Sequence, residues 1–250
     1  MIVTITMPKG GVAKSTSAAA LGDGLARRGY KVLLIDLDKQ CDLTKIIGGP
    51  RDHSQNSYVM VRRELQPEPV ELKENLFLIP SIPELVGAEV ELINQTAREH
   101  ILRECLEPFV ETFDIVLIDT PPNLGMLTAN AMTAADYLLI PVKSEYLAVD
   151  ATNDLFKTIA TIKKYTNPKL EIAGAFMTIV EPNRNIDNAM SELASDIFGD
   201  KTFASRIRKA AAAVEAGACN VPLSDYNPRC TAHVDYENLT DEIVERLLKK

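Results

Sequence analysis

The N-terminal stretch MIVTITMPKGGVAKST (residues 1–16) contains an apolar run, a glycine-rich turn and the start of a helical pattern. Residues 2–7 are mostly β-branched or apolar, which favours a strand. Residues 14–28 carry alanine and leucine at helical spacing, and the glycine that follows is suited to end a helix. Between the two, glycines allow backbone N–H groups to turn inward around phosphate oxygens. The order of strand, turn and helix therefore predicts a phosphate-binding loop.

Beyond this stretch, apolar runs alternate with amphipathic segments along most of the chain. Unbroken apolar runs, such as KVLLI at 31–35, indicate strands that are buried on both faces of a parallel sheet. The later strands that we expect are residues 31–35, 76–79, 114–118, 137–142 and 172–180. The later helices that we expect are residues 84–113 with a break near Pro108, 124–135, 150–165 and 186–198. This alternation predicts a doubly wound α/β fold with a mainly parallel sheet flanked by helices.

The composition narrows the possible classes of protein. The formal net charge is 27 − 35 = −8, and 46% of the 250 residues are hydrophobic. This balance excludes a disordered chain and argues against one that coats nucleic acid over its whole surface, while a local basic patch stays open. No apolar run reaches the ~20 residues of a membrane span, and the N-terminus does not have the pattern of a signal peptide. We therefore expect a cytoplasmic protein with no membrane contact.

Three further expectations concern the organisation of the chain. Residues 1–250 are expected to form a single domain, with no room for an N-terminal helix-turn-helix. Residues 48–73, which are rich in proline and polar side chains, are expected to form a surface loop with a short helix. The four cysteines lack C-x-x-C spacing and the three histidines lie far apart, so no zinc site is expected.

The predicted loop departs from the usual P-loop pattern at one position. Lys14 and Ser15 match the lysine that reaches the β- and γ-phosphates and the hydroxyl that binds Mg²⁺. Ala13, however, stands where a second glycine is expected. If this position needs a positive φ, alanine costs about 1 kcal/mol more than glycine. We expect the loop to form with slightly strained geometry.

The stretch from Lys9 to Ser15, KGGVAKS, resembles the deviant Walker A motif of the ParA/MinD family of P-loop ATPases, most closely the short ParA-type (Soj-like) members. The resemblance implies that ATP and Mg²⁺ are the cofactors. It also implies an ATP-sandwich homodimer in which Lys9 reaches the partner's phosphates. By the same resemblance, the residues that hold the nucleotide are Gly10, Gly11, Val12, Ala13, Lys14, Ser15 and Thr16.

Two strands of the expected sheet end on aspartates. Asp36 and Asp38 share one side of the chain because strand residues alternate, and DLDKQ at 36–40 is similar to the family's Asp-x-Asp-x-Gln. The resemblance implies that Lys9, Lys14 and Asp38 are the catalytic residues and that Asp38 orients the attacking water. It also implies that Asp36 supports the nucleotide site. The run that ends on Asp119 matches Walker B, whose aspartate holds Mg²⁺ together with Ser15. No glutamate follows Asp119 as a conventional catalytic base, which suggests slow hydrolysis.

The family resemblance also bears on the biological role. It implies an ATPase that binds DNA non-specifically and drives plasmid or chromosome partition with an adaptor bound at a centromere-like DNA site. Arg206, Arg208 and Lys209 lie in the region through which such relatives contact DNA, although a solvated charged face is the other interpretation. Pro222 is the best candidate for the loop near the adenine. Residues 127–136 and 140–146 are also similar to the family.

Other roles within the family stay open. The alternative is a MinD-like or other cargo-positioning ATPase that does not act on DNA, for example at a division site or in a secretion or polysaccharide apparatus. Residues 238–250 have a mixed polar face without Phe or Trp, so we expect a final helix packed on the sheet and not a membrane anchor. The cysteines are not placed for an iron–sulfur cluster shared between subunits.

Overall fold

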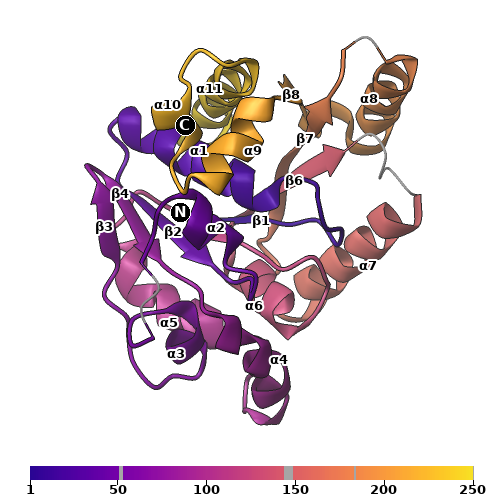
Figure 1. Ribbon diagram of the computed structural model, residues 1–250. Coiled ribbons are helices and arrows are strands. Elements are labelled where there is room, and N and C mark those ends of the chain that lie inside the picture. Colours follow the sequence, from indigo (N-terminus) through magenta and orange to yellow (C-terminus); the bar gives the residue numbers. More distant parts are fainter. Residues whose placement is uncertain (51–52, 144–148, 183, 250) are drawn as a thin grey trace.

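The computed structural model describes residues 1–50, 53–143, 149–182 and 184–249. Within these ranges the strands form one eight-stranded sheet in the order β3-β4-β2-β5-β1-β6-β7-β8, with helices on both faces (Figure 1). Neighbouring strands are parallel except for β3 and β4, which confirms the expected doubly wound α/β fold. The strands are β1 (Ile2–Ile5), β2 (Val32–Asp36), β3 (Val70–Lys73), β4 (Leu76–Ile79), β5 (Ile115–Asp119), β6 (Tyr137–Lys143), β7 (Glu171–Val180) and β8 (Thr202–Arg208).

The helices differ widely in length, and short 3₁₀ or π-helical turns extend several of them. The α-helices are α1 (Lys14–Arg27), α2 (Asp42–Ile46), α3 (Ser57–Val61), α4 (Ala88–Glu91), α5 (Ile101–Val110), α6 (Met126–Ala134), α7 (Val149–Tyr165), α8 (Asn185–Phe198), α9 (Ala211–Ala218), α10 (Leu223–Tyr226) and α11 (Thr231–Ile243). The 3₁₀ segments are η1 (Pro83–Gly87), η2 (Leu92–Asn94) and η4 (Gly199–Lys201), and η5 (Val244–Leu248) is π-helical.

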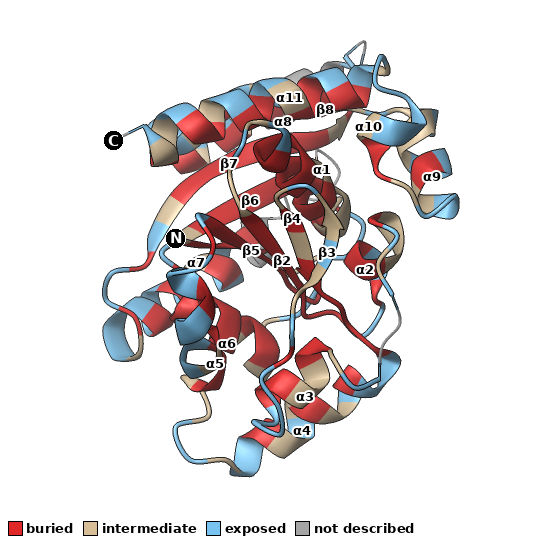
Figure 2. Cartoon of the chain, turned by 90° about the vertical axis from the view of Figure 1, so that its left-hand side faces the viewer, coloured by how far each residue is buried: buried red, intermediate tan, exposed pale blue. Residues whose placement is uncertain are grey.

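Successive strand residues pack into two hydrophobic cores, one on each face of the sheet. In β2, Leu33 and Ile35 belong to the core that also contains residues of α5 and α6, whereas Leu34 belongs to the core beneath α1 and α11. All three are fully buried, and Figure 2 shows the central strands as almost entirely buried. Burial on both faces explains why these strands read as unbroken apolar runs.

Most expected elements are present within two residues of their predicted ends, but the predicted helix at 84–113 differs inside. Pro108 does not break it: this residue lies within α5, which continues for two residues beyond it. The break lies earlier, after η2, because the residue that follows this segment, Gln95, has an extended backbone (φ −88°, ψ 145°). A proline in the last turn removes only one helical hydrogen bond. The buried apolar face of α5, which includes Ile101 and Leu106, keeps the helix in place.

The sequence pattern does not predict the two edge strands. β3 lies within residues 48–73, expected to be loop and short helix, and it pairs with β4 across a turn in which Asn75 has φ 63°. β8 pairs with β7 and contains Arg206 and Arg208. Edge strands are covered on fewer sides than central ones, so they lack the continuous apolar run that identifies a buried strand.

The C-terminal segment packs on the sheet, as expected. Tyr236, Leu239, Ile243 and Leu247 are buried in the core that α1 also covers. In the described part of the chain, no helix combines the length and the apolar character that crossing a membrane requires. In the family-like stretch at 140–146, residues 144–146 lie outside the described residues.

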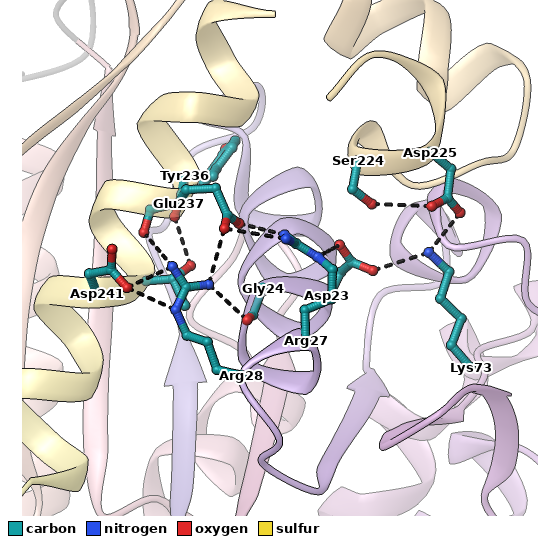
Figure 3. Close-up of polar contacts among 11 residues, drawn as sticks. Asp23, Gly24, Arg27, Arg28, Lys73, Ser224, Asp225, Tyr236, Glu237 and Asp241 are labelled. Atoms are coloured by element: carbon teal, nitrogen blue, oxygen red, sulfur yellow. Dashed lines mark hydrogen bonds and ion pairs between the residues drawn. The ribbon is translucent and has the colours of Figure 1, made fainter. Parts of the chain in front are cut away.

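A network of charged side chains holds α1 against three other elements (Figure 3). Asp23, which is only 3% exposed, accepts hydrogen bonds from Arg27 Nε at 3.0 Å and from Lys73 Nζ of β3 at 3.1 Å. The ammonium group of Lys73 also pairs with Asp225 of α10, and the guanidinium of Arg27 pairs with Glu237 of α11. The far end of α1 is therefore fixed to β3, α10 and α11 by partnered charges.

Candidate functional site

A cleft of about 760 Å³ opens at the edge of the sheet where the parallel strands end. Residues that follow β1, β2 and β5 line it, together with Ile179 of β7, the end of β8 and α9. Ligands of open α/β folds bind outside the carboxyl ends of the strands. The predicted loop residues on its wall are Gly10, Gly11, Ala13, Lys14, Ser15 and Thr16.

The loop between β1 and α1 forms a tight turn. The Lys9 N–H donates to the Met7 carbonyl at 2.7 Å, and Gly11 has φ 72°. Ala13 caps α1 from the left-handed region, with φ 61° and ψ 33°. The positive φ that the missing glycine suggested is therefore present, at a cost of about 1 kcal/mol relative to glycine.

β7 supports this loop from behind. Val12 is buried, and its carbonyl accepts a hydrogen bond from Thr178 Oγ1 at 3.1 Å. The next residue, Ile179, lies on the cleft wall with φ 56°, which is rare for a β-branched side chain. Such strain costs ~1–3 kcal/mol and persists where the surrounding structure imposes it. Sequence reasoning missed both residues, because nothing in the apolar run at 172–180 distinguishes them.

Lys14 is the positive charge at the base of the loop. Its side chain is buried, and Nζ donates to the Lys9 carbonyl at 3.0 Å. Burial lowers the pKa of Lys14, and the negative charges of Asp119 and Asp38 oppose that change only in part. The first turn of α1 therefore holds a desolvated ammonium group close to two carboxylates.

Asp36 and Asp119 stand side by side at the ends of β2 and β5, where they are register partners. Asp36 Oδ2 accepts hydrogen bonds from the Thr44 N–H and Oγ1 at 2.9 and 2.7 Å. Asp36 Oδ1 accepts one from the Asp38 N–H at 3.0 Å. Burial raises the pKa of Asp36 to about 6, although the hydrogen bonds from Thr44 oppose the shift. Asp36 thus fixes the turn that carries Asp38, and it does not line the cleft.

Asp119 has no such partners. Both carboxylate oxygens are buried, and neither accepts a hydrogen bond of ordinary geometry from the described residues, although the Ser15 hydroxyl lies near enough to favour the charged form. Burial, followed by the charge of Asp36, raises the pKa of Asp119 well above its ordinary value. A buried carboxylate without donors is costly, and a cation is the natural partner for it.

The donor set fits Mg²⁺. Asp119 and Ser15 offer hard oxygen ligands, which this ion prefers. Within the described ranges, no group of three or more His, Cys, Asp and Glu side chains could hold a metal by itself. Mg²⁺ at Asp119 would therefore take its remaining ligands from water and phosphate, which is its usual mode in nucleotide sites.

Asp38 and Lys9 lie at different depths of the site. Asp38 is 8% exposed and lines the cleft, and its Oδ1 accepts a hydrogen bond from the Gln40 N–H at 3.0 Å. Lys9 is half-buried and is not among the lining residues. A single chain therefore brings Asp38, and not the Lys9 side chain, to the cleft wall.

The three basic residues predicted to contact DNA do not share one environment. Arg208 lines the cleft and forms a two-point ion pair with Asp235 of α11, with Nε–Oδ2 and Nη2–Oδ1 distances of 2.8 and 2.7 Å. Lys209 also lines the cleft and pairs with Glu181 at 3.4 Å. Arg206 is exposed. Sequence reasoning could not find these acidic partners, because they lie 27 and 28 residues away.

Apolar side chains form part of the cleft wall. Ile207, Ala210, Ala213 and Val214 line it from the end of β8 and from α9. Pro222, predicted to lie near the adenine, is instead buried at the N-cap of α10 and is not among the lining residues. The alanine-rich run at 210–213 is the sequence signal for this wall.

Known proteins are similar to this chain over most of its length. A family model described as an AAA domain matches residues 1–172. The chromosome-partitioning ATPase Soj of Treponema pallidum (strain Nichols) is 35% identical over 242 residues, which cover 95% of this chain and 94% of that protein.

Two solved structures share the whole fold. A plasmid partition protein from Borrelia burgdorferi has a TM-score of 0.79 and 26% identity, covering 98% of both chains. Cobyrinic acid a,c-diamide synthase from Mycobacterium smegmatis, with bound ADP and magnesium, has a TM-score of 0.86 and 27% identity, covering 99% of this chain and 95% of that chain. The family match and the near full-length identity to Soj show that the chain belongs to the ParA/Soj family of P-loop ATPases.

Proposed function

We propose that this chain is a slow ATP-hydrolysing switch that forms an ATP-sandwich dimer, binds DNA non-specifically and drives plasmid or chromosome partition with a centromere-binding adaptor. The observation that carries the proposal is the buried Asp119 carboxylate, which accepts no hydrogen bond of ordinary geometry from the described residues and lies near the Ser15 hydroxyl and Lys14. The name of the Soj relative supports partition, and the ADP and magnesium of the M. smegmatis structure support the cofactors ATP and Mg²⁺.

The proposed chemistry is the hydrolysis of ATP to ADP and phosphate, and it needs positioning and charge neutralisation more than covalent help. Residues 10–16 hold the phosphates through backbone N–H groups and the positive end of α1. Lys14 offsets charge on the β- and γ-phosphates. Ser15 and Asp119 hold Mg²⁺, which when bound neutralises charge on the phosphate oxygens.

The remaining roles concern the attacking water and the second protomer. Asp38, on the cleft wall, accepts a hydrogen bond from the water and orients it, and Asp36 keeps the Asp38 turn in place through its bonds to Thr44 and to the Asp38 N–H. Lys9 acts on the phosphates of the partner. Its half-buried position outside the cleft of its own chain is compatible with that role.

DNA binding in this proposal rests on a small number of cations. Arg206 is exposed and is the strongest of the three candidates, whereas Arg208 and Lys209 are held by Asp235 and Glu181. Contacts to phosphates are independent of sequence and weaken steeply with salt. Because the net charge of the chain is −8, affinity per monomer should be low, and dimerisation should raise it strongly. The same acidic surface suits a basic peptide from the adaptor.

Binding to a non-specific DNA duplex, measured with and without ATP and Mg²⁺ over a salt series, tests the partition role. We expect binding only with ATP and Mg²⁺, lost as salt rises, and weakened by Arg206→Ala. Arg103→Ala, at an exposed arginine of α5, is the matched control. No ATP-dependent binding at low salt would overturn the partition role.

A cargo-positioning ATPase that does not act on DNA is the second candidate. The observation that favours it is that Arg208 and Lys209 are already in ion pairs, which leaves fewer cations for DNA. In that case ATP hydrolysis and ATP-dependent dimerisation would persist in the same preparation that fails to bind DNA.

A further inference from the structure

The helix that follows the Walker B aspartate is capped from a distant segment. α6 begins after Gly125, which has no side chain with which to cap it. The first N–H of the helix, that of Met126, instead donates to Glu89 Oε2 of α4 at 2.7 Å. A carboxylate at a helix N-terminus makes a charge-assisted hydrogen bond and meets the positive end of the helix dipole. Glu89 thus serves as the N-terminal cap of a helix 37 residues away.

The fit between Glu89 and the helix start is close. A Cβ atom at position 125 would lie 2.5 and 2.7 Å from the two oxygens of Glu89, so only glycine leaves room for the carboxylate. The backbone of Gly125, with φ −78°, does not itself require glycine. Oε1 of Glu89 is buried without a hydrogen bond among the described residues, and this costs stability. The carboxylate at this position therefore needs an explanation other than stability.

The capped helix start is also one end of a loop in the candidate site. Residues 120–125 run from buried Asp119 to the N-cap, and Pro122 between them lines the cleft opposite Gly10. Near the Asp119 end, Thr120 Oγ1 donates to the Ile5 carbonyl at 2.9 Å. At the other end, the bond from Met126 to Glu89 fixes the chain. The loop is therefore held at both ends, once by the sheet and once by Glu89.

The segment that carries Glu89 is itself firmly placed. Leu85, Ala88 and Leu92, on either side of it, are buried in the hydrophobic core. The Tyr58 hydroxyl donates to Glu91 Oε1 at 2.9 Å and ties α4 to α3. A rigid α4 can therefore hold the start of α6, and through it the loop, in one position.

We propose that Glu89 is a positioning residue for ATP hydrolysis: by capping α6 it holds the loop at 120–125 in place over the nucleotide cleft. This inference rests on the proposed ATPase function. Lys14 and the backbone at 10–16 keep their own supports, the bonds from Thr178 to the Val12 carbonyl and from Lys14 to the Lys9 carbonyl. Loss of the cap therefore slows hydrolysis more than it weakens binding of ADP, which relies on those groups.

The test compares single-turnover ATP hydrolysis, ADP–Mg²⁺ affinity and the thermal midpoint in full-length variants. Glu89→Ala should hydrolyse ATP about tenfold more slowly, with ADP affinity within about twofold of the parent, the size expected for loss of one charge-assisted cap. Glu89→Gln, which keeps an acceptor oxygen, should lose about threefold. Glu84→Ala, at an exposed carboxylate in η1, is the matched control and should hydrolyse at the parental rate.

Gly125→Ala provides a second and independent arm. In the parent the new methyl group displaces the Glu89 carboxylate, so hydrolysis should slow as in Glu89→Ala. In the double variant the space is already empty, so adding Gly125→Ala should cause no further loss. Parental hydrolysis in Glu89→Ala, or losses that multiply in the double variant, would overturn the inference.

These outcomes separate the inference from the function on which it rests. A parent that hydrolyses no more ATP than Lys14→Ala would refute the proposed ATPase, whatever Glu89 does. An active parent whose rate is unchanged in Glu89→Gln and Gly125→Ala would refute the role of Glu89 alone. If Glu89→Ala does not fold, those two variants still decide the matter.

Discussion

Asp23 and Asp119 are both buried aspartates, but they lie in opposite electrostatic surroundings. Asp23, near the end of α1, accepts hydrogen bonds from Arg27 and Lys73. Burial alone would raise the pKa of Asp23, but the Ser224 hydroxyl and the charge of Lys73 lower it below its ordinary value. Asp119, near the start of the same helix, has no hydrogen bond of ordinary geometry from the described residues, and burial beside Asp36 raises its pKa.

The difference separates a carboxylate that stabilises the fold from one kept for a ligand. The protein supplies the cations for Asp23 from its own side chains, and that network joins α1 to β3, α10 and α11 (Figure 3). Near Asp119 it places only the Ser15 hydroxyl and the charge of Lys14, which oppose the rise in the pKa of Asp119 only in part. An unpaired buried charge persists where binding of a cation compensates for its cost.

Lys14→Ala should have the largest effect, because it removes the charge at the ligand-binding end of α1. We expect ATP affinity to fall by more than about 100-fold, or ~2.7 kcal/mol, since the charge-assisted contacts to two phosphates are lost. Titration with a fluorescent ATP analogue measures this. Lys163→Ala, at an exposed lysine of α7, should bind ATP like the parent. Equal affinity in the two variants would remove Lys14 from the site.

Asp23→Asn tests the structural side of the comparison. Loss of the partnered charge should lower the free energy of unfolding by about 1–2 kcal/mol, a value reduced because Arg27 and Lys73 are partly exposed. Urea denaturation gives the value, and ATP affinity should stay unchanged. Asp225→Asn, an exposed partner of Lys73, is the control and should change stability by less than about 0.5 kcal/mol. A larger loss of stability in Asp225→Asn would show that Lys73, and not Asp23, is the main stabilising residue of the network.

The pH dependence of that difference follows from the lowered pKa of Asp23. A lowered pKa in the folded state means that the charged form contributes stability above the unfolded pKa of about 3.9. That contribution is lost as the pH falls through the lower, folded pKa. The stability gap between the parent and Asp23→Asn should therefore be constant from pH 5 to 8 and shrink below about pH 4. A stability difference that widens in acid would contradict a lowered pKa of Asp23 in the folded protein.

Ala13→Gly should have the smallest effect. Relief of the left-handed strain returns about 1 kcal/mol, and the greater flexibility of unfolded glycine offsets about half of it. We expect a net gain of about 0.5 kcal/mol in unfolding free energy, together with a rise in nucleotide affinity. Ala20→Gly, within α1, should instead lose about 1 kcal/mol. Losses of similar size in both variants, with unchanged affinity, would show that the loop is not strained.

The sequence predicts the ligand-binding end of this comparison better than the structural end. The loop and the aspartates Asp36 and Asp119 follow from local patterns, because strand ends and glycine-rich turns are encoded by adjacent residues. Of the partners of Asp23, Arg27 lies one helical turn away, but Lys73 cannot be found this way, since it lies 50 residues away on an edge strand without an apolar run. The same limit applies to Arg208 with Asp235 and to the cap that Glu89 provides for α6.

Two prolines show how packing and local sequence signals can differ. Pro222 is predicted to lie near the adenine, but it is buried at the N-cap of α10, and Ala210 and Ala213 line the cleft without it. Pro108 has the local context of a helix break, but the apolar face of α5 outweighs the single lost hydrogen bond. Tertiary packing overrides a local signal when its cost is only a few kcal/mol.

The central claim is that Asp119 is held buried and unpaired for a cation, and the stability of Asp119→Asn tests it most directly. Urea denaturation should be measured for the parent and the variant, each without nucleotide and with ATP and Mg²⁺. We predict that the nucleotide-free variant is more stable than the parent by about 2 kcal/mol, since an unpaired buried charge is gone, and that ATP with Mg²⁺ stabilises only the parent. A nucleotide-free variant that is less stable than the parent, or one that ATP and Mg²⁺ stabilise equally, would contradict the account.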